Sequence, residues 1–437
     1  SFGHEERLMT STTFVAEPRM GKAQLIAACT IGNALEFYDF VIFSFFAGTI
    51  GALFFPAENA TVQLMLSLAT YGVGFVLRPL GGVVLGAYAD RKGRKKATIL
   101  TLFLMAVGTA MIGLLPTYAQ IGPVAPFLIV VARLLQGFSA GGEVGASTTL
   151  LAEYAPKDER GFYGSWQLAS QGLAVLAAAA FAVTINTVLP APEVKAWGWR
   201  IPFLMGIFIV PIGLWLRSAL RETHANEDDA RTRGVSSLSL TFKQHMGKVV
   251  LGVMMIIGGT AANAIVVLYM STYAVRQLHM PPKTALFAGL AAGFVTLVIA
   301  PIAGAVSDRV GRKPVAWVSY VLLAVTIYPA FLLLNANPTL PMLLGVVFFL
   351  GSLNAAGGAT IIITLAEIFP AEVRATGMSL VYALGVAIFG GFGQFIVTWM
   401  IRVSGDPMAP AWYVVACCAA TVLALFGIKE MSRRDLD

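Results

Sequence analysis

Hydrophobic residues along this chain are gathered in twelve long runs that polar segments separate. Most of the runs reach or exceed the roughly 20 residues that a helix needs to cross a membrane. The pattern therefore predicts an all-α membrane protein with twelve transmembrane helices. The runs lie near 23–55, 62–89, 97–116, 122–150, 163–188, 201–219, 248–275, 284–307, 314–335, 339–366, 376–401 and 410–428.

A polar and charged segment divides these runs into two sets of six. It lies between the sixth and seventh runs and contains clustered Glu, Asp and Arg residues. We expect two pseudo-symmetric six-helix bundles that a cytoplasmic linker joins. The predicted parts are an N-terminal tail (1–22), an N-terminal bundle (23–216), the linker (217–247), a C-terminal bundle (248–428) and a C-terminal tail (429–437).

Composition agrees with a membrane location. Hydrophobic residues make up 57% of the chain and charged residues only 12%, whereas soluble domains carry about 25% charged residues. The net charge of +7 does not indicate a nucleic-acid partner, because the basic residues follow the loops. If both termini are cytoplasmic, the inner segments hold 23 of the 30 Lys and Arg residues. This bias predicts a multi-pass protein of the cell inner (plasma) membrane with both termini cytoplasmic.

Two motifs occur once in each half of the chain. The segment 86–95, with the pattern G-x-x-x-D-R-x-G-R-K, returns at 304–313. A second pattern, L-A-E followed by Pro and then Arg, begins at Leu151 and returns at Leu365. The similar spacing of the two copies indicates an internal repeat of the six-helix unit, as in transporters built from parallel repeats.

The repeated G-x-x-x-D-R-x-G-R-K loop and the twelve-helix plan resemble the major facilitator superfamily. Further segments are similar to its metabolite:proton symporter branch, with the closest likeness to citrate/tricarboxylate–proton symporters. They are Glu36-Phe-Tyr-Asp39-Phe, Arg78-Pro79-Leu-Gly-Gly, the stretch from Arg133 to Glu143, Trp197-Gly-Trp-Arg-Ile-Pro202-Phe and Ala387-Ile-Phe-Gly-Gly. The resemblance implies secondary transport of citrate, tricarballylate, 2-oxoglutarate, shikimate, proline or betaine.

Acidic residues in the first and fourth runs are the candidates for proton coupling. A carboxylate in the middle of a membrane helix is costly, so it usually faces a polar interior and has a function. Asp39 and Arg133 fall at nearly the same depth, and we expect them to pair. The resemblance to sugar–proton symporters supports this role. Glu36 and Glu143 compete for it, and a permanent structural salt bridge is the alternative.

Polar residues near mid-depth are the candidates for binding the substrate. Amide, phenol and guanidinium groups can ligate carboxylate or hydroxyl oxygens, although hydrogen bonds between helices would explain the same residues. The candidates are Asn33, Tyr38, Arg133, Gln136, Gln167, Gln171, Asn354 and Tyr382.

The repeated loops predict a cytoplasmic gate. Asp90 and its second copy Asp308 are expected to accept hydrogen bonds from the N-terminus of a neighbouring helix, while nearby arginines reach Glu153 and Glu367. In the alternative, the cations only set topology and the glycines only make turns. The predicted gate comprises Gly86, Asp90, Arg91, Gly93, Arg94, Glu153, Asp308, Arg309, Arg312, Glu367 and Arg374.

These observations predict a proton-coupled symporter that imports a small organic acid by alternating access. The acids of the N-terminal half outnumber its deeply placed arginine, which favours a zwitterion such as proline or betaine as the alternative substrate. A facilitator or efflux pump and a membrane sensor are further alternatives. No metal cluster, Walker loop or nucleophile triad is evident, so we expect no enzyme activity, no cofactor and no nucleic-acid partner. The expected partners are the organic acid, the proton and the lipid bilayer, and the protein is expected to be a monomer.

Overall fold

The computed structural model describes residues 22–92, 94–141, 148, 151, 155–207, 245–370, 373–428 and 430, and these residues form helices and connecting turns. The N-terminal half contains α1 (Lys22–Phe45), α2 (Ala47–Phe54), α3 (Ala60–Val76), α4 (Arg78–Lys92), α5 (Arg94–Leu114), α6 (Tyr118–Ile121), α7 (Val124–Ser139), η1 (Lys157–Glu159), α9 (Arg160–Val188), α10 (Ala191–Ala196) and η2 (Gly198–Arg200). The C-terminal half contains α13 (Met246–Ala262), η3 (Asn263–Tyr269), α14 (Met270–Arg276), α15 (Pro282–Ala285), α16 (Phe287–Val310), α17 (Arg312–Ala336), α18 (Leu340–Ile368), α19 (Arg374–Gly385), η4 (Val386–Gly391), α20 (Gly393–Ser404) and α21 (Ala409–Phe426).

The helices match the predicted spans. Within the described residues, eight helices are long and apolar enough to cross a membrane, and a ninth forms if the bent pair α1–α2 is one span. Two shorter apolar helices, α5 and α7, coincide with the third and fourth predicted runs. The sixth run begins as a helix at Ile201, and the described part of it ends at residue 207. The predicted linker lies almost wholly outside the described residues.

Several spans are interrupted rather than straight. The first bends by 65° between α1 and α2. The second breaks at Leu77, between α3 and α4. Pro79 helps to explain this break, because proline cannot donate a hydrogen bond to the carbonyl four residues earlier. Two spans of the C-terminal half contain the π-helical segments η3 and η4. Such segments are rare and are frequently found at functional sites.

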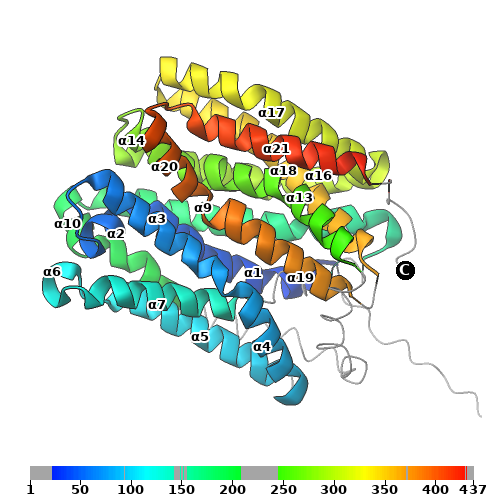
Figure 1. Ribbon diagram of the computed structural model, residues 1–437, viewed down its shortest axis with the longest axis horizontal. Coiled ribbons are helices and arrows are strands. Elements are labelled where there is room, and N and C mark those ends of the chain that lie inside the picture. The colour runs from blue at the N-terminus through cyan, green and yellow to red at the C-terminus, as the bar shows by residue number, and fades with distance from the viewer. Residues whose placement is uncertain are drawn as a thin grey trace, which may run out of the picture.

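The two halves lie side by side, with α9 and α16 in close contact between them (Figure 1). Small residues allow these two helices to approach closely. A methyl group added to Gly161 of α9 would collide with the carbonyl oxygen of Gly304 on α16, and one added to Gly172 would lie 2.5 Å from the backbone nitrogen of Leu297. The interface therefore runs along much of the length of both helices.

Inside the N-terminal half, glycines also bring α3 against α7. A methyl group on Gly137 would collide with the carbonyl oxygen of Gly74. This approach places Arg133, one turn before Gly137, directly against α3, where a methyl group on Gly74 would lie 3.2 Å from its Nη2 atom. The packing therefore positions the guanidinium group that the sequence identified.

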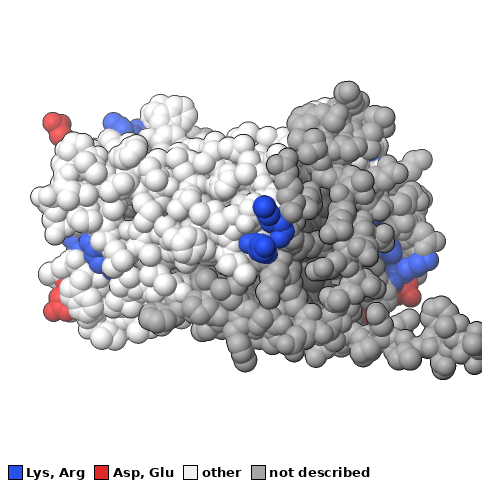
Figure 2. Space-filling view, turned by 90° about the horizontal axis from the view of Figure 1, so that it is seen from below, with Lys and Arg blue, Asp and Glu red and all other residues white. Residues whose placement is uncertain are grey.

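The outer surface is suited to lipid. On the face shown in Figure 2, a broad uncharged area separates charged residues at the left edge from those at the border with the grey region. Many exposed side chains are large and apolar, including Phe103, Phe127, Val188, Val325 and Leu423. Monomeric soluble proteins rarely expose so much contiguous apolar surface.

Candidate functional site

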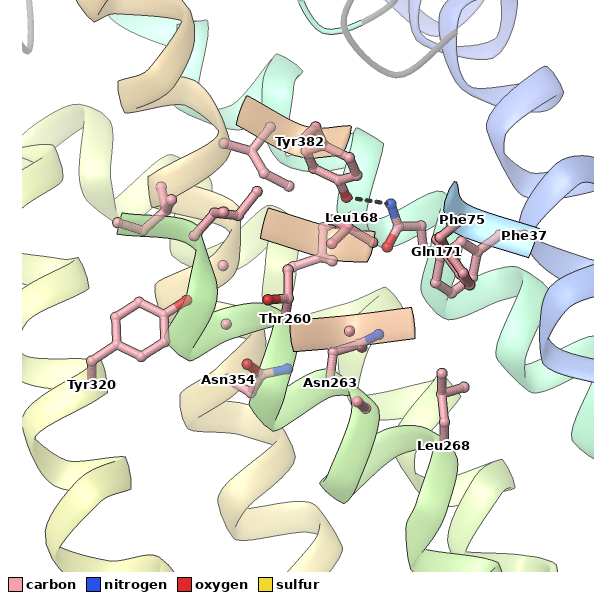
Figure 3. Close-up of a pocket in the computed structure, with 18 of the residues that line it drawn as sticks. Phe37, Phe75, Leu168, Gln171, Thr260, Asn263, Leu268, Tyr320, Asn354 and Tyr382 are labelled. Atoms are coloured by element: carbon pink, nitrogen blue, oxygen red, sulfur yellow. Dashed lines mark hydrogen bonds between the residues drawn. The ribbon is translucent and has the colours of Figure 1, made fainter. Parts of the chain in front are cut away.

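A cavity lies between the two halves, and its empty space, counted together with the open solvent that it meets, is about 640 Å³ (Figure 3). The N-terminal half contributes Phe37, Tyr71, Phe75, Leu168 and Gln171. The larger share of the lining comes from α13, η3, α17, α18, α19 and η4. None of the described residues that line the cavity is charged. A small polar molecule bound in the cavity would therefore contact no charged side chain among these lining residues.

Neutral polar groups are distributed around this lining. Nε2 of Gln171 on α9 donates to the hydroxyl of Tyr382 on α19 at 3.2 Å, which joins the two halves directly (Figure 3). Thr260, Asn263 and Asn354 are further polar residues of the C-terminal half. Both π-helical segments reach the cavity, η3 at Asn263 and η4 at Val386 and Gly390.

Asp39 lies in the N-terminal half, behind the cavity wall, and is almost fully buried. The hydroxyl of Thr109 on α5 donates to its Oδ2 atom. Nε2 of Gln136 donates to Oγ1 of Thr109 at 3.0 Å, and Nη1 of Arg133 donates to Oε1 of Gln136 at 2.8 Å. This hydrogen-bond chain runs in one direction, from the guanidinium of Arg133 to the carboxylate of Asp39.

The prediction of a direct ion pair between Asp39 and Arg133 is wrong. No such pair occurs among the residues that the structure describes, and Gln136 and Thr109 stand between the two side chains. The reason is the position of Asp39, whose Oδ1 atom lies against Gly206, where an added methyl group would be 2.8 Å away. The carboxylate therefore faces α5 and the helix that begins at Ile201.

Aromatic rings surround the guanidinium of Arg133, which has no exposed surface. Its Cζ atom lies 4.3 Å from the ring centroid of Phe40, 4.6 Å from that of Phe43 and 5.2 Å from that of Tyr71. Its Nη2 atom also donates to the carbonyl oxygen of Tyr71 at 3.3 Å. Cation–π contacts of this kind stabilise a cation most strongly where water is excluded. Tyr71 also lines the cavity, so it connects the cavity with Arg133.

A second buried cation, Arg78, pairs with Glu36. Nη2 of Arg78 lies 2.8 Å from Oε1 of Glu36, and both side chains are almost fully buried. The guanidinium also lies 4.6 Å from the ring centroid of Phe40 and 4.4 Å from that of Phe75. Phe40 thus contacts both arginines. The sequence alone does not assign Arg78 to this cluster.

Comparison with known proteins agrees with this architecture. A family model described as "Sugar (and other) transporter" matches residues 25–232 and 217–437. The chain belongs to this family of the major facilitator superfamily. It is therefore a membrane transporter and not an enzyme.

Relatives of this transporter span nearly its full length. It is 39% identical to a citrate-proton symporter of Klebsiella pneumoniae, over 91% of this chain and 90% of the relative. It is 36% identical to a citrate-proton symporter of Salmonella typhi, over 95% and 96%. It is 31% identical to a proline/betaine transporter of Escherichia coli (strain K12), over 98% and 87%. Among solved structures, the proton:xylose symporter XylE bound to 6-bromo-6-deoxy-D-glucose superimposes with a TM-score of 0.75 at 18% identity, covering 95% and 97% of the two chains.

The structure divides the predicted substrate residues of the transporter into two groups. Gln171, Asn354 and Tyr382 line the cavity. The other candidates do not line it. They are Asn33, Tyr38, Arg133, Gln136 and Gln167.

Two residues of the second group join helices. Nδ2 of Asn33 donates to the carbonyl oxygen of Gln167 at 3.1 Å and to Oγ of Ser170 at 2.9 Å, which fastens α1 to α9. The hydroxyl of Tyr38 donates to the carbonyl oxygen of Pro202 at 3.2 Å. These bonds are the interhelical alternative that sequence analysis left open.

The second copy of the predicted gate joins the two halves at one end of the molecule. The carboxylate of Asp308 on α16 accepts hydrogen bonds from the backbone nitrogens of Gly161 at 2.8 Å and Phe162 at 2.9 Å, in the first turn of α9. These N–H groups have no partner within their own helix, and a negative charge there is favourable. The geometry expected for Asp308 is thus present.

Arg312 connects the carboxylates of this end. Its Nη1 atom lies 2.7 Å from Oδ1 of Asp308, and its Nη2 atom lies 3.3 Å from Oε1 of Glu367 on α18. Nε of Arg374 donates to the carbonyl oxygens of Ala366 and Phe369. Arg309, the other predicted cation, is exposed. We call Asp308, Arg312 and Glu367 the gate cluster.

The first copy of the gate is largely outside the described residues. This applies to Gly93 and Glu153 and to the side chains of Asp90, Arg91 and Arg94. Glu143, a predicted proton-coupling residue, also lies outside them. Gly86 is described, and an added methyl group there would meet no atom within 4 Å.

Three residues that the sequence did not single out contact the candidate site or the gate cluster. Thr109 stands next to Asp39, Tyr320 lines the cavity, and Glu430 accepts hydrogen bonds from the backbone nitrogens of Arg312 and Lys313. Thr109 and Tyr320 are isolated polar residues in apolar runs. For Thr109 that signal is weak, because threonine hydroxyls in helices commonly bond to their own backbone, as Thr109 also does to Met105.

We expect Asp308→Asn to open the gate-cluster end of the molecule. Asparagine removes the charge that binds the first turn of α9, and charge-assisted hydrogen bonds contribute about 1.5–3 kcal/mol. A cysteine introduced at Thr364, buried near this end of α18, should react roughly tenfold faster with a water-soluble maleimide in this variant.

The control for this experiment is Asp406→Asn. Asp406 follows α20 and accepts a hydrogen bond from the backbone nitrogen of Met408, away from the gate cluster. This variant should leave the thiol reactivity at position 364 unchanged. If the cysteine at position 364 reacts equally fast with and without Asp308→Asn, the gating role of Asp308 is contradicted.

Proposed function

We propose that this transporter is a proton-coupled symporter that imports a small organic acid, of the citrate or tricarballylate type, by alternating access. The hydrogen-bond chain from Asp39 to Arg133 carries the proposal. It connects a titratable acid, buried inside the bundle, through Thr109 and Gln136 to a cation that packs against a residue of the cavity wall, Tyr71. In a membrane interior, ionisable groups placed in this way are typical of proton relays.

The hydrogen bond that the Thr109 hydroxyl donates can change when Asp39 takes up a proton, which links Asp39 to Gln136 and Arg133. A hydroxyl has one proton, and Oγ1 of Thr109 has two acceptors within reach, Asp39 and the carbonyl oxygen of Met105 at 3.0 Å. When Asp39 is ionised, the hydroxyl donates to it. When Asp39 takes up a proton, Asp39 becomes the donor and the Thr109 hydroxyl turns to Met105. The protonation step thus removes the carboxylate charge that orients Gln136 and Arg133.

The charge balance of the N-terminal half supports an acidic substrate. In the buried cluster around Phe40, the acids Asp39 and Glu36 are balanced by Arg133 and Arg78. Protonation of Asp39 leaves this cluster with one excess positive charge, behind the wall formed by Tyr71 and other aromatic residues. Such a charge attracts an anion even without direct contact, because the interior screens electrostatic interactions weakly.

Substrate contacts would come from the neutral groups of the cavity. Gln171 and Tyr382 contact each other across the two halves, and a substrate that binds both would couple its own position to their separation. Asn354 offers a further amide. The similarity to two citrate-proton symporters supports a tricarboxylate.

A zwitterion such as proline or betaine is the alternative substrate. The uncharged lining of the cavity favours it, and so do the proline/betaine transporters among the relatives. In this proposal the protein lies in the inner membrane with both termini cytoplasmic, and the gate cluster closes the cytoplasmic side.

Uptake into proteoliposomes tests the proposal and separates the substrates. With an inward proton gradient, the protein should accumulate labelled citrate above the external concentration, and collapse of the gradient should abolish accumulation. An excess of unlabelled tricarballylate should compete, whereas betaine should not. Accumulation of betaine but not citrate would establish the alternative, and uptake that ignores the proton gradient would refute proton coupling.

We expect Asp39→Asn to abolish accumulation driven by the proton gradient, because asparagine cannot take up and release a proton. Exchange of labelled for unlabelled substrate across the membrane requires no net proton movement and should continue. The measurement is gradient-driven uptake beside counterflow in the same vesicles. If the variant still accumulates substrate as the unmodified protein does, Asp39 is not the coupling residue.

We expect Thr109→Val to reduce gradient-driven accumulation by roughly tenfold, since hydrogen bonds to charged groups contribute about 1.5–3 kcal/mol. Valine keeps the shape of threonine but cannot connect Gln136 with Asp39. Thr109→Ser is the matched control because it keeps the hydroxyl, and it should retain most of the activity. A serine variant as defective as the valine variant would indicate a packing role instead.

A further inference from the structure

Tyr320 lines the cavity but belongs to a helix that contributes no other residue to the described lining. It belongs to α17, which packs mainly on α18 and α21. Its side chain has no exposed surface, yet it is part of the cavity lining. Figure 3 shows the ring extending from α17 with its hydroxyl directed toward the neighbouring helix that carries Thr260.

Glycines on two neighbouring helices make room for this side chain. A methyl group on Gly259 of α13 would collide with the Tyr320 hydroxyl, and one on Gly357 of α18 would lie 2.8 Å from its ring. A methyl group on Gly358 would also come within 3.9 Å of the hydroxyl. With any larger residue at Gly259 or Gly357, the tyrosine could not reach the cavity in this conformation.

The hydroxyl at the end of this side chain has no hydrogen-bond partner in the described part of the chain. Buried tyrosine hydroxyls usually have a partner, because leaving a polar group unpaired in an apolar environment is costly. Oδ1 of Asn354, another residue of the cavity lining, is also buried without a partner among the described residues. Two unpaired polar atoms therefore belong to one cavity.

We propose that Tyr320 and Asn354 form a substrate subsite for a hydroxyl or a protonated carboxyl group of an organic acid. This inference rests on the proposed function and specifies how the cavity recognises its substrate. A hydroxyl or a carboxylic acid can accept a hydrogen bond from the phenol and donate one to the amide oxygen at the same time. Both residues are neutral and none of the described lining residues is charged, so an ionised carboxylate would lack a counter-charge at this position.

The test compares the binding of citrate and tricarballylate to the purified full-length protein and to Tyr320→Phe. Tricarballylate is citrate without its hydroxyl group, so the pair separates the two groups that the subsite could bind. Phenylalanine removes only the unpaired oxygen. We expect the dissociation constant of citrate, measured by calorimetry, to rise roughly threefold to tenfold in the variant.

The response to tricarballylate identifies the bound group. If the subsite binds the hydroxyl, the variant should lose affinity for citrate but not for tricarballylate. If it binds a protonated carboxyl, both affinities should fall together. Either result supports the subsite, whereas unchanged affinity for both compounds overturns it.

Thermal stability without ligand separates recognition from structural support. Because the hydroxyl of Tyr320 has no hydrogen-bond partner among the residues that the structure describes, its removal should leave the melting temperature unchanged or raise it. A matched control is Tyr328→Phe, on the same helix, where the ring packs against Trp412 and does not line the cavity. It should change neither affinity. A lower melting temperature in Tyr320→Phe, with a parallel loss of affinity, would show a structural role and overturn the proposal.

If the proposed organic-acid substrate is wrong, the binding measurements give a result that differs from failure of the subsite. If the unmodified protein binds neither acid, the organic-acid substrate is wrong, and the same comparison is made with proline and betaine. Proline carries N–H donors and betaine carries none. Loss of proline affinity in Tyr320→Phe would support the subsite for another substrate. Unchanged proline affinity in this variant would overturn the subsite. If no compound binds the unmodified protein, a lower melting temperature of Tyr320→Phe would overturn the subsite as well.

Discussion

Charged groups buried in a membrane-spanning bundle need partners within the protein, because lipid cannot solvate them. This constraint explains most of the interior of the N-terminal half. Glu36 binds Arg78, aromatic rings surround Arg133, and a chain of two neutral side chains connects Arg133 with Asp39. Each charge is stabilised, and among these four groups, as far as the structure describes them, the direct ion pair is Glu36 with Arg78. An arrangement in which Asp39 accepts from a hydroxyl leaves it freer to change protonation than a tight salt bridge would.

The two halves share the gate motif in sequence, but the described side chains at mid-depth differ between them. The repeated sequence motif places Asp308 and Arg312 at the end of the C-terminal half, where they bind Glu367 and the first turn of α9. At mid-depth the C-terminal half has no counterpart of the buried charge cluster among its described cavity residues. It contributes amides, phenols and two π-helical segments instead. The cavity therefore lies between the buried charged cluster of the N-terminal half and the neutral polar groups of the C-terminal half.

One helix, α9, contacts the gate cluster, the cavity and α1. Its first turn binds Asp308, its middle receives the hydrogen bonds of Asn33 from α1, and Gln171 reaches Tyr382 across the cavity. It also packs closely on α16 of the other half. A movement of α9 relative to α16 would therefore change the gate, the cavity and the attachment of α1 together. Such a shared element provides a physical route for linking these regions, since rigid helices with two discrete arrangements transmit coupling.

The sequence by itself determined the helical spans, the repeat and the acids and arginines inside the bundle. Each of these is a local property: an apolar run of sufficient length predicts a span, and a charge within it stands out. Tertiary structure alone decided which groups touch. Asp39 faces Thr109 rather than Arg133, Arg78 belongs to the buried cluster, and Tyr320 passes between glycines to the cavity. These contacts depend on how each helix is rotated and how closely its neighbours approach, and hydropathy along one chain carries neither quantity.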